Sequence, residues 1–196
     1  KMAYLRRLLF HAQVIAVCEA PCSHQDMRIL AKDIDKDFYI IGTNGTSSSA
    51  GILFFVHRSL FISESQVTQE VLCKGRVTTL SISTDQRKMT FWAVHNFGLK
   101  QLAPQVKSRI RAVFRSHLAQ VHSAPAANSL WAMGDWNFLD KNDLIFSTRS
   151  PTSPHAHRSN EETKLWKDLL SQLTLLHSPD ATHFWSGQFS TLDRIY

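Results

Sequence analysis

The stretch LWAMGDWN, which runs from Leu130 to Asn137, says most about how this chain folds. Its apolar first half is typical of a buried strand, and Gly134 leads straight from that strand into Asp135 and Asn137. Polar side chains at a strand end are held by a rigid scaffold and still reach solvent, as an active site requires. We therefore expect Asp135 and Asn137 to lie at the functional edge of a sheet.

Two other apolar runs end in the same way. Residues 14–18 lead into Glu19, and residues 91–94 lead into His95 and Asn96, which we assign to substrate binding. Carboxylates hold Mg²⁺, which needs only one or two protein ligands and neutralises charge on phosphoryl oxygens. Imidazole and amide groups contact the remaining oxygens, and a second carboxylate orients the attacking water. Three such strand ends together predict a site for metal-assisted phosphate chemistry.

The segment from Gly134 to Phe138 resembles the Gly-Asp-Phe-Asn signature of the endonuclease/exonuclease/phosphatase superfamily. Three further segments resemble this family in the same order: a strand ending in a metal-binding Glu at 14–20, a Gly-rich strand entry at 49–54 and a Ser-x-x-Asp-x-Ile segment at 190–196. Within the family they are most similar to endonuclease domains of non-LTR retrotransposons. The resemblance implies an α/β (α+β) fold, a DNase I-like four-layer αββα sandwich, formed by one domain over residues 1–196 and incomplete at both termini.

The resemblance also implies a role for each of these residues. Glu19 would be the ligand of a Mg²⁺ ion, Asp135 would position the nucleophilic water, and Asn137 would contact the scissile phosphate. His95 matches the phosphate-binding His of DNase-like members, and Asp193 would orient a catalytic His.

Two segments of the family have no match in the sequence. Family members begin with a strand that ends in an Asn, which helps to bind metal and phosphate, and nothing before Met2 corresponds to it. They end with a Ser-Asp-His segment whose His works with the counterpart of Asp193, whereas this sequence stops at Tyr196. Loss of general acid–base assistance costs roughly 10² to 10⁴ in rate, so we expect catalysis to be impaired.

Positive charge is concentrated in the middle of the chain. The net charge is +6, and no Asp or Glu occurs between Gln86 and Gly134. Within that stretch Lys107, Arg111 and Arg115 are spaced four apart, so a helix would gather them into a basic stripe. The stripe could bind the phosphates of a substrate or an acidic protein surface, or it could be an ordinary solvated face.

Three functions therefore stay open. The first is a Mg²⁺-dependent phosphodiesterase or endonuclease that acts on nucleic acid or another phosphate-bearing substrate. The second is a non-catalytic structural or binding subunit of a larger assembly that reuses a nuclease fold. The third is a phosphatase of the same fold that acts on small phosphorylated molecules, because one fold supports many substrates.

Hydrophobic periodicity predicts the other elements of the chain. Helices are expected at residues 2–11, 23–35 and 104–121 and after Asn160, and strands at 38–41, 51–56, 76–83, 89–95, 182–185 and 191–196. The strands at 76–83 and 89–95 are expected to form a hairpin. Trp131, Trp166 and Trp185 are expected in the core.

Cysteine content and hydropathy bear on the compartment. The three cysteines are an odd number, which favours reduced thiols and an intracellular protein over a disulfide framework. No apolar run reaches the roughly 18 residues that span a bilayer, and no signal peptide is recognisable.

Overall fold

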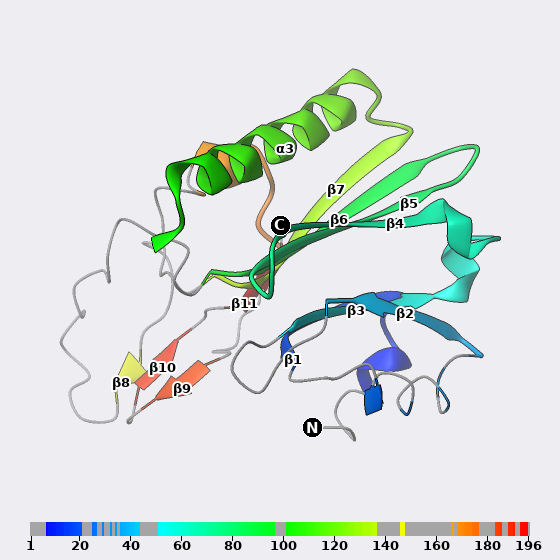
Figure 1. Cartoon of the computed structure of the whole chain (residues 1–196), viewed down its shortest axis with the longest axis horizontal. Coiled ribbons are helices and arrows are strands. Elements are labelled where there is room, and N and C mark those ends of the chain that lie inside the picture. The colour runs from blue at the N-terminus through cyan, green and yellow to red at the C-terminus, as the bar shows by residue number, and fades with distance from the viewer. Residues whose placement is uncertain are drawn as a thin grey trace.

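Two β-sheets face each other in this computed structural model, and helices cover their outer faces (Figure 1). The structure describes residues 7–20, 25–26, 29, 32, 34, 36–43, 51–96, 101–136, 146–147, 166, 168–176, 183–185, 188–190 and 193–195. Helix α3 (Pro104–Ser123) lies over the larger sheet, and Leu8, Leu9 and Ile34 pack against the outer face of the smaller one. The predicted αββα order of layers is therefore confirmed.

The smaller sheet consists of three antiparallel strands in the order β1 (Val14–Ala20), β3 (Gly51–His57) and β2 (Phe38–Gly42). Its central strand is buried from Gly51 to Val56 because the larger sheet covers one face and the helical residues cover the other. A strand covered on both faces reads as a continuous apolar run, which explains why β3 was recognisable in the sequence.

The larger sheet has the order β11 (Asp193–Ile195), β7 (Asn128–Asp135), β6 (Lys88–His95), β5 (Val77–Ser83) and β4 (Val67–Cys73). Strands β5 and β6 form the predicted antiparallel hairpin, and α3 carries the chain across to β7, which runs parallel to β6. Strand β4 was not predicted. It lies at the edge of the sheet and buries only Val67 and Leu72, so its sequence lacks a regular apolar alternation.

Short elements complete the described chain. The 3₁₀ turns η1 (Arg58–Leu60) and η2 (Glu64–Gln66) link β3 to β4. Strands β8 (Phe146–Ser147), β10 (Gln188–Ser190) and β9 (His183–Trp185) form a third, antiparallel sheet. Residues 166 and 168–170 are helical, in agreement with the helix expected after Asn160.

The interior divides into two main cores. The sheet–sheet core fills the space between the two sheets and includes Phe54, Leu80 and Phe91. The helix–sheet core lies between the larger sheet and α3 and includes Trp166, as predicted. The prediction for Trp131 was wrong, because this side chain is 38% exposed on a part of β7 that β11 does not pair with. The side chain of Trp185 lies outside the part of the chain whose burial is described.

Candidate active site

The ends of β6 and β7 bring His95 and Asp135 side by side. The two strands are parallel, and their register pairs Val94 with Gly134 and His95 with Asp135. A Cβ atom on Gly134 would lie 2.0 Å from the carbonyl oxygen of Val94, and the residue has a φ of 141° that other residues rarely adopt. Glycine at this point of the signature therefore allows the close approach that sets the two polar side chains next to each other.

Glu19 reaches the same place from the opposite sheet. The pairing of β1 with β3 becomes irregular between Val17 and Ala20, and Glu19 has a φ of 54°, which is uncommon for a residue with a side chain. A bulge of this kind changes the direction in which a side chain points. Here it directs Glu19 toward β6, where its Oε1 lies 3.3 Å from Nε2 of His95.

The strained backbone of Glu19 is itself informative. A residue held at positive φ costs about 1–3 kcal/mol, and such residues are concentrated at functional sites. The Glu19 side chain remains 64% exposed even though its partner His95 is 3% exposed. The carboxylate is thus fixed at one end by a buried imidazole and open to solvent at the other, as expected of a group that binds a cation or substrate.

His95 also contacts Arg76, the residue directly before β5. Nη1 of Arg76 lies 2.6 Å from Nδ1 and 3.4 Å from Nε2 of the ring. Burial lowers the pKa of His95 below its usual value of 6.5, the nearby Glu19 carboxylate partly offsets this effect, and the Arg76 guanidinium lowers the pKa further. At neutral pH the imidazole is therefore uncharged.

Asn96 has a different place from the one the sequence predicted. It is fully buried, and its amide nitrogen donates to the carbonyl oxygen of Trp136 over 2.6 Å. Its side-chain oxygen accepts a 2.9 Å hydrogen bond from Nε1 of Trp166, and its backbone N–H donates to the carbonyl oxygen of Asp135. We therefore assign Asn96 to holding the ends of β6 and β7 together, in place of the substrate contact expected from the sequence.

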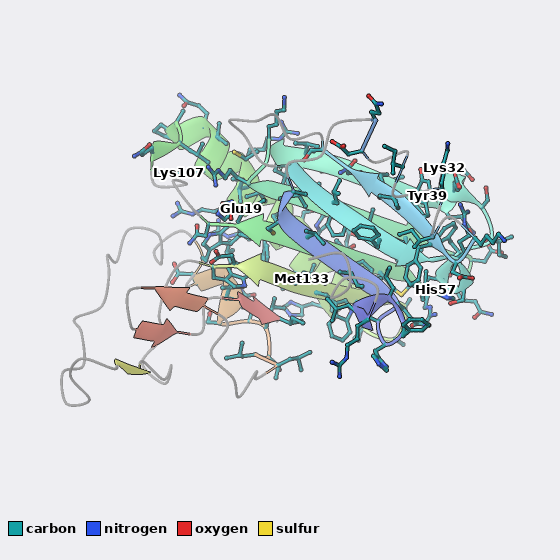
Figure 2. The ribbon with its side chains drawn as sticks, turned by 90° about the horizontal axis from the view of Figure 1, so that it is seen from below. Glu19, Lys32, Tyr39, His57, Lys107 and Met133 are labelled. Carbon is teal, nitrogen blue, oxygen red and sulfur yellow. The ribbon has the colours of Figure 1, made fainter. Side chains whose placement is uncertain are left out.

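The remaining predicted residues are distributed unevenly around this edge. Asp193 pairs in register with Asp135, so its backbone lies beside the site, whereas Asn137 lies outside the described residues. In Figure 2, Lys107 lies at the same end of the molecule as Glu19. Arg111 and Arg115 follow at successive turns of α3, and of the three basic residues Lys107 and Arg111 are half-buried whereas Arg115 is exposed.

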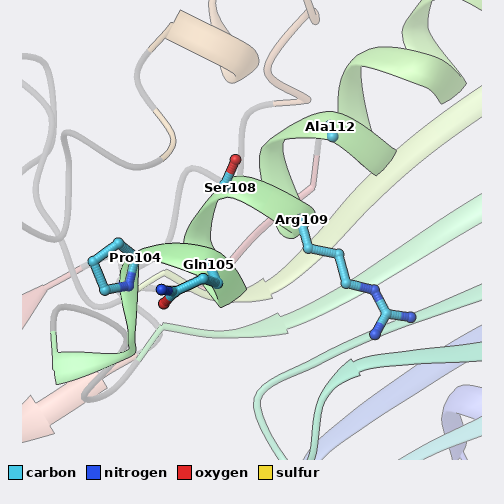
Figure 3. Close-up of a pocket in the computed structure, with 5 residues that line it drawn as sticks. All are labelled: Pro104, Gln105, Ser108, Arg109 and Ala112. Atoms are coloured by element: carbon cyan, nitrogen blue, oxygen red, sulfur yellow. The ribbon is translucent and has the colours of Figure 1, made fainter.

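A shallow pocket on α3 is separate from these residues (Figure 3). It is lined by Pro104, Gln105, Ser108, Arg109 and Ala112, all on the first half of the helix. Nη2 of Arg109 binds Oε1 of Glu70 on β4 at 2.9 Å, so the one charged group of this lining is paired. Among these five residues Ser108 is the one possible nucleophile, and none of the others is a base that could activate it.

A Mg²⁺ ion would fit the donors at the strand ends. The described part of the chain contains no group of three or more His, Cys, Asp or Glu side chains that could enclose a metal. Mg²⁺ does not need such a group, because it usually keeps several waters and binds through one or two carboxylates. Glu19 contacts His95 and Asp135 pairs with it in register, so both are positioned to supply carboxylates of this kind. No helix among the described residues is long and apolar enough to cross a membrane.

Sequence reasoning missed Arg76, although a signal for it was present. The turn at residues 84–87 pairs Ser83 with Lys88, and counting back along both strands from this pair places Arg76 opposite His95. The backbone confirms the register, because the N–H of His95 donates to the carbonyl oxygen of Arg76 over 2.7 Å. The register of the predicted hairpin is therefore the signal that places Arg76 at the site.

Comparison with known proteins supports the fold. No protein-family sequence profile and no curated protein sequence matches the chain. A truncated TDP2 from Caenorhabditis elegans matches with a TM-score of 0.55 and 13% identity over 99% of this chain and 73% of that one. ANGEL2, a 2′,3′-cyclic phosphatase, matches with a TM-score of 0.58 and 13% identity over 98% and 71% of the two chains.

The endonuclease domain of TRAS1, a telomere-specific non-LTR retrotransposon, matches with a TM-score of 0.53 and 11% identity over 98% of this chain and 75% of that one. Identities this low establish the fold alone. At that level the expectation from the four sequence segments is confirmed: the chain shares the DNase I-like fold of these three proteins.

Proposed function

We propose that the chain is a Mg²⁺-dependent phosphodiesterase whose reaction centre lies where β1, β6 and β7 end. The observation that carries this proposal is the meeting of Glu19, from the smaller sheet, with the His95–Asp135 pair of the larger sheet. His95 is buried with two acidic residues from different sheets beside it, and burying a polar group costs free energy. A reaction centre at this position would account for this cost in free energy.

Glu19 and Asp135 are the residues that would hold the metal. Once bound, Mg²⁺ neutralises charge on the phosphoryl oxygens of the substrate. Asp135 is half-buried, so its carboxylate is held in place and yet can accept a hydrogen bond from the attacking water. We further propose that Asn137, which follows directly in the chain, contacts the scissile phosphate.

Nucleic acid is the substrate class that the charge distribution favours. The chain carries a net charge of +6, and Lys107 lies at the same end of the molecule as Glu19. Basic residues beside a phosphodiesterase site attract the phosphates of a polyanion. Among the structural relatives, TDP2 of Danio rerio was crystallised with a single-stranded DNA product, and its structure matches this chain with a TM-score of 0.52.

Hydrolysis assays on the whole chain test the proposal. We expect slow Mg²⁺-dependent nicking of plasmid DNA and slow cleavage of the small diester bis(4-nitrophenyl) phosphate, in line with the impaired catalysis expected from the sequence. Asp135→Asn should lower both rates by roughly 10² to 10⁴, because it removes the carboxylate that orients the water. Asp85→Asn is the matched control, since Asp85 is an exposed carboxylate in the turn at the other end of β6.

Two results would contradict the proposal. One is a parent chain without activity on any phosphodiester, which would favour a non-catalytic role for the fold. The other is a parent rate that Asp135→Asn leaves unchanged, since a contaminating nuclease would then be its source. Cleavage of a 2′,3′-cyclic nucleotide without cleavage of DNA would assign the site to small phosphorylated molecules.

A further inference from the structure

Arg76 is bound to His95 through both backbone and side chain. Its carbonyl oxygen accepts the 2.7 Å hydrogen bond from the N–H of His95. The register of the hairpin therefore fixes the backbone position from which the Arg76 side chain extends. The guanidinium then returns to the ring of the same residue, where Nη1 lies 2.6 Å from Nδ1. Arg76 is half-buried, and the ring that it contacts is almost fully buried.

The chemistry of these groups gives the contacts a direction. A guanidinium can only donate hydrogen bonds and stays protonated in proteins. The 2.6 Å contact to Nδ1 is much shorter than the 3.4 Å contact to Nε2, so Nδ1 is the acceptor. The ring hydrogen then resides on Nε2, which is the nitrogen that faces Oε1 of Glu19 at 3.3 Å. A hydrogen bond therefore joins Arg76 to His95, and the N–H of the ring lies beside the Glu19 carboxylate.

We propose that Arg76 is a positioning residue for the Glu19 carboxylate and acts through the ring of His95. This inference rests on the proposed function, because it assumes that Glu19 holds the cation. Without the guanidinium, His95 could place its hydrogen on Nδ1, and the bare Nε2 would then face a carboxylate oxygen, which is also an acceptor. With the guanidinium in place, one carboxylate oxygen is occupied by His95 and the other is free to turn toward a cation.

The need for this support follows from the position of Glu19. Its backbone is strained and its side chain is mostly exposed, so the contact with His95 is what holds the carboxylate once the bulge has turned it toward β6. Groups that orient a metal ligand without touching the metal typically contribute 10- to 100-fold to metal affinity or activity. The Arg76–His95 pair is the described feature of the site that fits such a role.

Nitrogen NMR on the whole chain with ¹⁵N-labelled histidine tests the first step. At pH 8 the parent should show His95 with its hydrogen on Nε2, and the signal is assigned by its disappearance in His95→Gln. Arg76→Met should reduce the population of that tautomer, and Arg76→Lys, which keeps a donor, should retain it. A parent in which the hydrogen resides on Nδ1 would overturn the proposal without any variant.

Mn²⁺ binding, measured by the loss of free-ion signal in electron paramagnetic resonance, tests the second step. We expect Arg76→Met to weaken the affinity for Mn²⁺ by about 10- to 100-fold, and Arg76→Lys to recover most of the loss. Arg87→Met is the matched control, because Arg87 is exposed in the turn at the opposite end of the hairpin. Circular dichroism identifies any variant that is unfolded.

The outcomes separate this inference from the proposed function. If Arg76→Met keeps both the tautomer and the Mn²⁺ affinity of the parent, Arg76 does not position Glu19. A parent that binds no Mn²⁺ overturns the positioning role together with the metal assignment. If Mn²⁺ binding depends on Arg76 but no phosphodiester is cleaved, the positioning role stands and only the proposed phosphodiesterase activity is wrong.

Discussion

The two main cores of the molecule lie on opposite faces of the larger sheet and differ in chemistry. The apolar side chains buried in the sheet–sheet core are aliphatic, phenyl and thioether groups, none of which donates a hydrogen bond. The helix–sheet core contains three buried tryptophans, and two of them donate hydrogen bonds to polar side chains. Trp92 donates to Nδ1 of His117 on α3, and Trp166 donates to the side-chain oxygen of Asn96.

This difference separates stability from positioning. Burial of apolar surface is non-directional, so the sheet–sheet core favours the folded state without selecting one arrangement of the strand ends. A hydrogen bond requires a particular distance and angle, so the link from Trp166 to Asn96 determines where β6 ends. Asn96 in turn binds the backbone at Asp135 and Trp136. The candidate site is thus aligned from the helix side of the sheet, although its carboxylates face the other side.

The largest change in stability is expected in the sheet–sheet core. Leu80→Ala removes a fully buried side chain between the two sheets and should lower the free energy of unfolding by roughly 2–5 kcal/mol. Urea titration gives this value, while the hydrolysis rate per folded molecule should stay near that of the parent. A large fall in that rate would show that this core also positions the site.

Trp166→Phe should have a smaller effect on stability and a larger effect on the site. It keeps an aromatic ring but leaves the buried oxygen of Asn96 without its donor, which costs about 1–3 kcal/mol. We expect weaker Mn²⁺ binding and slower hydrolysis. Trp92→Phe is the matched control, because it also removes a buried donor but one that binds His117, away from the strand ends. Equal loss of activity in the two variants would contradict the comparison.

At the bulge of β1, the backbone conformation is expected to affect stability and the carboxylate is expected to affect function. Glycine adopts positive φ without strain, whereas alanine does not. The free energy of unfolding of Glu19→Gly should therefore exceed that of Glu19→Ala by about 1 kcal/mol. Neither variant should bind Mn²⁺ like the parent. Urea titration of the pair measures the difference, and equal stabilities would show that the backbone at residue 19 is not strained.

The smallest expected effect is a dependence on pH that belongs to the helix–sheet core. Burial lowers the pKa of His117 below 6.5, Lys88 lowers it further, and Glu70 partly offsets them. The unfolded chain therefore takes up a proton before the folded one does, and stability is lost as the pH falls below about 6.5. His117→Asn, which does not titrate, should reduce the slope of the unfolding free energy measured between pH 7.5 and 5. His95, whose pKa is lowered too, contributes to the slope that remains. An unchanged slope would contradict the role of His117.

Local patterns were enough to predict much of the fold. The strands at β2, β3, β5, β6 and β7 and the helix α3 are each recognisable because apolar side chains repeat with the period of the element that buries them. Polar residues that end such runs identified Glu19, His95 and Asp135 as neighbours, and the structure brings the three together. Each of these inferences needed only residues that are adjacent in the chain.

Other features depend on residues far apart in the sequence, and only the tertiary structure decided them. Asn96 reads as one more polar residue at a strand end, and it is buried because Trp166, 70 positions later, covers it. The contact of Arg76 depends on the register of a hairpin, and the direction of Glu19 depends on a bulge against β3. The sequence by itself determined which groups stand at the ends of the strands, since periodicity is local. Packing between distant segments decided which of them face solvent and which hold the others in place.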